Sequence, residues 1–77
     1  MKNDRILETV IEETVDDVTG KLNLVQEYDD RLKYTVEIRR CDAVAGYAEY
    51  RSKETAIENF WKKLERFSGK KKLAVRG

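Results

Sequence analysis

The sequence has no histidine, no proline and a single cysteine, Cys41, among its 77 residues. Without histidine it lacks the commonest metal ligand and the only side chain whose ordinary pKa lies near neutrality. Catalytic dyads and triads that use an imidazole base are therefore excluded. One cysteine can form neither an intramolecular disulfide nor a cysteine-based zinc site. We expect an inert thiol at Cys41, no catalytic residues, no metal site and no cofactor.

Long apolar segments are also missing. No apolar run approaches the roughly 20 residues that a membrane-spanning helix requires, and the residues after Met1 do not resemble a signal peptide. The four glycines are too dispersed for a phosphate-binding loop. Acidic pairs occur at 12–13, 16–17 and 29–30, but nothing near them is apolar enough to raise a carboxyl pKa for acid–base catalysis. We therefore expect residues 1–77 to form one small, soluble, cytoplasmic domain that is not an enzyme and has no membrane partner.

Charged residues make up 40% of the chain, and they are unevenly distributed although the net charge is only +1. Residues 1–30 contain nine acids and three bases, whereas residues 31–77 contain thirteen bases and six acids. Such asymmetry can mark an interaction surface. The alternative is that the two halves pair in the folded protein and neutralise each other.

The segment ETVIEETVDDVTGKLNL, residues 8–24, has two interpretations. Its apolar residues recur at nearly helical spacing, which favours an amphipathic helix. However, most of them are β-branched and so suit a strand better. A turn through residues 17–19 followed by Gly20 at positive φ would also make a bulged hairpin connection. We predict the hairpin, and the helix is the alternative.

The rest of the chain indicates strands followed by one helix. Residues 32–39 alternate apolar and polar side chains, as a half-buried strand does. A turn at residues 29–30 precedes this strand, and a turn at RCDA follows it and leads into a further strand at residues 43–51. Ser52 as N-cap and Gly69 as the C-terminal stop bound a helix with one apolar stripe. The stripe consists of Ala56, Ile57, Phe60, Trp61, Leu64 and Phe67.

These elements predict an α+β fold. It is an antiparallel β-meander of three to four strands packed on one C-terminal helix, with the aromatic residues of the helix, including Trp61, in the core. The segment KKLAV, residues 71–75, can add a short edge strand. If the N-terminal segment is helical instead, the order of elements becomes α-β-β-β-α.

The sheet face opposite the helix is predicted to combine basic residues with an aromatic one, a combination that suits phosphate contact and base stacking. The residues are Lys21, Arg31, Lys33, Arg39, Tyr47 and Arg51. Residues 31–67 loosely resemble the integrase arm-binding and AP2-type DNA-binding domains, whose sheets enter the major groove. This resemblance implies DNA binding, although Glu27, Glu37 and Glu49 on the same face would repel phosphate.

The α-β-β-β-α alternative resembles the double-stranded-RNA-binding domain. Ser52, Lys53 and Ala56 match the start of the helix that is rich in lysine in that family. Glu54 and Ile57 stand where the family has lysine, and no histidine loop follows the first strand. The resemblance implies RNA binding, and no site residue is transferred from it.

Charge favours a protein partner over a nucleic acid. The sequence pI is about 7.8, below the value of ~9 that is usual for nucleic-acid-binding domains. A charge-split molecule is suited to steered docking on a complementary protein surface. The predicted partner-binding residues are Glu12, Glu13, Asp16 and Asp17 on the acidic side, and Arg39, Arg51, Lys70, Lys71 and Lys72 on the basic side.

Edge strands offer a second route to association. Residues 5–15 or the segment KLAV can pair with a partner strand or with a second copy, which would give a homodimer. Small one-domain proteins without catalytic residues, many of them phage-encoded, often act as inhibitors or adaptors. We therefore expect an inhibitor or adaptor that docks on a protein, with DNA or RNA binding through the basic sheet face and the C-terminal basic segment as the alternative.

Overall fold

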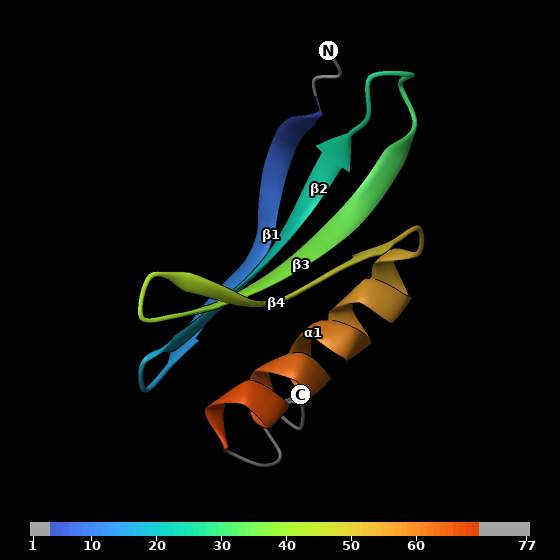
Figure 1. Ribbon diagram of the computed structural model, residues 1–77. Helices are drawn as coiled ribbons and strands as arrows, with labels where there is room; N and C mark the ends of the chain where they lie inside the picture. The colour runs from blue at the N-terminus through green and yellow to red at the C-terminus, as the bar shows by residue number, and fades with distance from the viewer. Residues whose placement is uncertain (1–3, 70–77) are drawn as a thin grey trace.

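Residues 4–69 form four consecutive strands and then one helix (Figure 1). The structure, a computed structural model, describes residues 4–69. Its elements are β1 (Arg5–Val15), β2 (Val18–Gln26), β3 (Leu32–Arg40), β4 (Ala43–Tyr50) and α1 (Lys53–Ser68). Each strand pairs antiparallel with the next, so the sheet order is β1-β2-β3-β4 and the outer strands are β1 and β4. The predicted meander on a C-terminal helix is confirmed, and the segment KKLAV lies outside the described residues.

The N-terminal segment is a hairpin, as predicted, because its β-branched residues fill a pleated strand. The predicted position of the turn is wrong. The turn consists of Asp16 and Asp17, and Asp16 has the positive φ (57°) that primed hairpin turns require at their first position. Gly20 lies inside β2, where a Cβ atom would come within 2.9 Å of Cε1 of Phe60. Glycine is needed at this position for close packing and not for the turn.

The other two turns follow the sequence prediction. Between β2 and β3, the N–H of Asp30 donates to the carbonyl of Glu27 (2.8 Å), and Asp30 has φ 71°. Between β3 and β4, Cys41 and Asp42 both have positive φ, 52° and 66°. Positive φ at both positions of a two-residue connection is the requirement of a type I′ turn, which favours asparagine and glycine. The β3–β4 turn is therefore built from residues that are not optimal for it.

The core lies between α1 and one face of the sheet. Ser52 caps the helix by accepting a hydrogen bond from the N–H of Thr55 (3.3 Å), and Gly69 ends it in the left-handed region. The predicted apolar stripe is confirmed, with Phe60 completely buried and Trp61 packed edge-on against it at 4.9 Å between ring centroids. The fully enclosed residues are Val18, Leu22, Val36, Ile38, Ala56, Phe60 and Leu64.

The helix covers one face of a curved sheet and leaves the other face open (Figure 1). It packs mainly against β2, β3 and β4, and Val10, Ile11 and Val15 of β1 pack against the margin of the core. Within residues 4–69 no helix has the length and apolar character that crossing a bilayer demands. Among residues 4–69, no element covers the open face, and no further strand pairs with the outer edges of β1 and β4.

Candidate functional site

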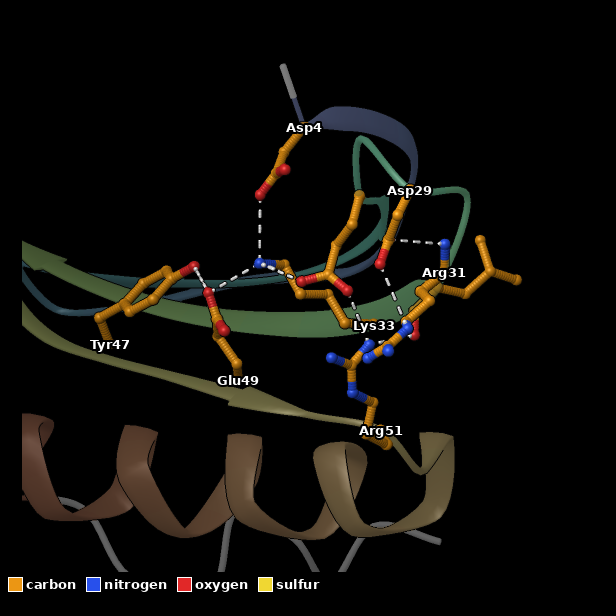
Figure 2. Close-up of polar contacts among 9 residues, drawn as sticks. Asp4, Asp29, Arg31, Lys33, Tyr47, Glu49 and Arg51 are labelled. Atoms are coloured by element: carbon orange, nitrogen blue, oxygen red, sulfur yellow. Dashed lines mark hydrogen bonds and ion pairs between the residues drawn. The ribbon is translucent and has the colours of Figure 1, made fainter. Parts of the chain in front are cut away.

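The most enclosed charge on the open face is the ammonium group of Lys33, near the start of β3. The residue is only 6% exposed. Its Nζ lies 2.9 Å from Glu49 Oε2, 3.1 Å from Asp4 Oδ2 and 3.4 Å from Glu27 Oε2 (Figure 2). These carboxylates come from β4, from the residue before β1 and from the loop after β2. One cation therefore joins three separate segments of the sheet, and we call these four residues the Lys33 cluster.

The pKa values of Lys33, Glu49 and the neighbouring Tyr47 move away from neutrality. The bond to Glu49 is the largest cause that raises the pKa of Lys33, although its burial partly opposes the shift. Hydrogen bonds, first from Lys33 and then from Tyr47, lower the pKa of Glu49. Tyr47 is 53% exposed, but its hydroxyl donates to Glu49 (2.8 Å), and partial desolvation together with this bond raises its pKa to about 12. None of these three groups changes its charge near pH 7.

Arg51 extends the cluster toward the end of the sheet. Its Nη1 donates to Glu27 Oε1 (2.9 Å) and to the carbonyl of Leu32 (3.0 Å), which ties the end of β4 to the start of β3. In the neighbouring turn, Arg31 pairs with Asp29 at 3.3 Å (Figure 2). The basic side chains at this end of the open face are thus engaged by acidic ones.

Shallow hollows lined by side chains of mixed charge lie on the sheet. Val25, Asn23 and Thr35 are buried on the open face, with exposed fractions of 5%, 6% and 7%. A hollow of about 270 Å³ lies over these residues and is lined by Asp4, Ile6, Asn23, Val25, Lys33, Thr35, Glu37 and Tyr47. A hollow of about 400 Å³ near the two hairpin turns is lined by Glu12, Asp17, Thr19, Lys21, Arg39, Cys41 and Asp42.

The predicted basic set does not form one patch in the described part of the chain. Arg39 lies beside the β3–β4 turn and pairs with Glu37 at 2.7 Å. Arg51 lies at the opposite end of the sheet, on Glu27. Lys70, Lys71 and Lys72 lie outside the described residues. The two arginines are therefore separated, and both are neutralised by a neighbouring carboxylate.

The predicted acidic set divides between two faces and the hairpin turn. Glu12 is on the open face opposite Lys21, whereas Glu13 points to the helix side. Asp16 and Asp17 form the β1–β2 turn, where Asp17 Oδ2 lies 3.4 Å from Nε of Arg40. Of this set, only Glu12 and Asp17 line the same hollow.

Strand β1 differs from the rest of the sheet in the state of its carboxylates. Within residues 4–69, the side chains of Glu8, Glu12 and Glu13 make neither a hydrogen bond nor an ion pair, whereas the glutamates of β3 and β4 are paired. The same strand exposes Ile6 (64%) and Leu7 (46%). We call β1 with these five residues the acidic edge.

The Lys33 cluster was not predicted. The alternation of β3 placed Lys33 on the open face with Glu37, and the acids on that face were recognised. The expectation of an exposed lysine is wrong, because Asp4 reaches it from the start of β1. No local signal shows that contact, since the two residues are 29 positions apart in the sequence.

No protein-family model matches the chain, and comparisons with curated proteins and with solved structures also find no match. Nor does the described part of the chain gather three or more side chains suited to holding a metal ion.

Proposed function

We propose that this protein is a non-enzymatic inhibitor or adaptor that docks on a basic surface of a protein partner through its acidic edge. The observation that carries the proposal is the contrast in charge compensation within one sheet. Lys33 takes up three carboxylates and Glu37 is paired with Arg39, yet Glu8, Glu12 and Glu13 gather on one edge strand and none of them forms an ion pair among the described residues. Uncompensated charges at a rim mainly steer a complementary partner and fix its orientation.

The charge of residues 4–69 supports a protein partner rather than a nucleic acid. All 15 acidic residues lie within residues 4–69, whereas five of the 16 basic residues lie outside this range, which gives it a formal net charge of −4. The five basic residues are Lys2, Lys70, Lys71, Lys72 and Arg76. A surface with this net charge repels phosphate. Most basic side chains on the open face are already paired with carboxylates, so few of them could neutralise phosphates and release counterions from a nucleic acid.

The electrostatics of the Lys33 cluster support a role without catalysis. General acid–base catalysis needs a group whose pKa lies near the working pH. Here the pKa of Tyr47 is raised to about 12, that of Glu49 is lowered and that of Lys33 is raised. The cluster behaves as a permanently charged tie between strands and holds β1 at the edge of the sheet.

The test is affinity capture with a matched pair of double variants. The protein is immobilised, and the proteins retained from a lysate are quantified by mass spectrometry. Glu12→Lys/Glu13→Lys reverses two charges of the acidic edge, and Glu54→Lys/Glu58→Lys makes the same change of charge on α1. We expect the wild type and the α1 variant to retain the same protein, and the edge variant to lose at least about nine-tenths of it, a tenfold change in affinity.

Two results would contradict the proposal. One is equal capture of the same protein by both double variants, which would remove the acidic edge from the interface. The other is micromolar binding of a labelled random DNA or RNA duplex at physiological salt, with a steep dependence on salt concentration. Circular dichroism of both variants provides the control that each one keeps the fold.

A further inference from the structure

We propose that the acidic edge takes up an extended, basic segment of the partner as a fifth strand beside β1. The inference rests on the proposed function and adds how the partner binds. It follows from three features of β1: a free backbone edge, a stretch of regular register and a distribution of charge that opposes self-pairing.

Within residues 4–69, the backbone of β1 has hydrogen-bonding groups that no other strand uses. It is the longest strand, with 11 residues, and it pairs only with β2 within the described sheet. Hydrogen-bonded and non-hydrogen-bonded pairs alternate along an antiparallel ladder, so every second residue of β1 points its N–H and C=O groups away from β2. A row of such groups is a template for strand addition by an extended peptide.

The register of β1 places the docking stretch at Ile11–Val15. The ladder with β2 is irregular between Ile6 and Glu8 and again between Thr9 and Ile11, but it is continuous from Ile11 to Val15. Bulges twist an edge and discourage pairing, so the first half of β1 is the less suitable template. A strand beside Ile11–Val15 would meet Glu12 on the open face and Glu13 on the helix side.

The same stretch disfavours a second copy of the chain. Two copies of Ile11–Val15 paired antiparallel about their centre would place Glu13 directly opposite Glu13, with each Glu12 opposite Thr14 of the other copy. Like charges directly opposite each other destabilise a strand pair. Lysine or arginine at these positions of the added strand would instead neutralise both glutamates. The occupant that fits is therefore a basic segment of another protein.

The other edge strand, β4, carries no free charge that would favour a basic segment over any other. β4 contains one charged residue, Glu49, and this carboxylate is already bound by Lys33 and Tyr47. A segment added to β4 would gain backbone hydrogen bonds but no new ion pair with that strand. Charge complementarity thus assigns the basic segment to β1.

The experiment uses the capped peptide KVKKVKV, which carries lysine and valine on both faces of an extended strand. Its control is the same peptide N-methylated at the valines, which removes N–H donors from both edges and keeps every charge. Binding is measured by titration, and amide hydrogen exchange is followed by NMR. We expect the methylated peptide and the Glu12→Lys/Glu13→Lys variant each to bind at least about tenfold more weakly. The parent peptide should slow exchange at alternate residues between Ile11 and Val15 and leave the amides of β4 unchanged.

Several outcomes would overturn the inference. Equal affinity for both peptides without protection of β1 would mean docking by charge alone, and protection of β4 would identify the wrong edge. Protection of β1 that rises with protein concentration in the absence of peptide would make a second copy the occupant. Absence of binding by either peptide would also reject strand addition. None of these four outcomes contradicts the proposed function if Glu12→Lys/Glu13→Lys still fails to capture the partner. Failure of strand addition can therefore be distinguished from failure of the proposed function.

Discussion

Replacing Lys33 with methionine removes the cation that joins three carboxylates and keeps nearly the same side-chain length. Breaking a buried ion pair by removing one partner costs about 3–5 kcal/mol, because the remaining charge stays uncompensated. The side chains of Glu49 and Asp4 are 46% and 33% exposed, so water takes up part of their charge. We therefore expect Lys33→Met to lower the free energy of unfolding by about 2–3 kcal/mol at pH 7.

The loss should depend on pH with a definite sign. The folded-state pKa of Glu49 is lowered, so its contribution to stability is present above its unfolded value and is lost as the pH falls through the folded value. The folded-state pKa of Lys33 is raised, so its contribution is fully present below its unfolded value, roughly 10.4. The difference between wild type and Lys33→Met should thus be largest between about pH 5 and 10 and shrink below about pH 4 as the carboxylates are protonated.

The assay is urea unfolding followed by circular dichroism at pH 7 and at pH 3.5. Lys62→Met is the matched control, because it removes the same charge from an exposed pair in which Nζ of Lys62 is 3.5 Å from Glu58. It should change the free energy of unfolding by less than about 0.5 kcal/mol. If Lys33→Met were as stable as the wild type at pH 7, or if its deficit were the same at both pH values, the account of the Lys33 cluster would be refuted.

Two further predictions concern the core and the β3–β4 turn. Phe60→Ala should cost about 3–5 kcal/mol because Phe60 is fully buried, whereas Trp61→Ala, at a partly buried position, should cost roughly 2 kcal/mol. The denaturation midpoints of the two variants measure this difference. A larger loss of stability for Trp61→Ala would contradict the assignment of Phe60 to the centre of the core. Cys41→Asn combined with Asp42→Gly should raise the free energy of unfolding by about 1 kcal/mol, because both positions have positive φ. A lower midpoint in thermal unfolding would contradict this reading of the turn.

Local sequence signals predicted most of the fold. The β-branched residues of the N-terminal segment favoured a strand over a helix, and Ser52 and Gly69 marked both ends of α1. The position of the β1–β2 turn was not predictable in this way. Gly20 has the sequence signature of a turn residue, but the aromatic ring of Phe60 packs against it from 40 positions further along the chain. Tertiary packing decided the role of this glycine.

The charge pattern was predictable only in part. The sequence showed an acidic first half and a basic second half, with docking or mutual neutralisation as the two interpretations. The structure contains neutralisation at Lys33, which binds Asp4 and Glu27 from the acidic half. It also contains uncompensated carboxylates on β1. Whether a carboxylate pairs with a basic side chain depends on which strands are neighbours in the sheet. The amino-acid composition does not determine the order of the strands.

The central claim, that the acidic edge is the docking surface, is tested most directly by the association kinetics of the captured partner. Its association rate constant should fall as salt concentration rises, and Glu12→Lys/Glu13→Lys should lower that constant about tenfold or more at low salt. Glu54→Lys/Glu58→Lys should leave it within about twofold of the wild-type value, since α1 lies away from the acidic edge. An association rate that is unchanged in the edge variant and reduced in the α1 variant would contradict the account.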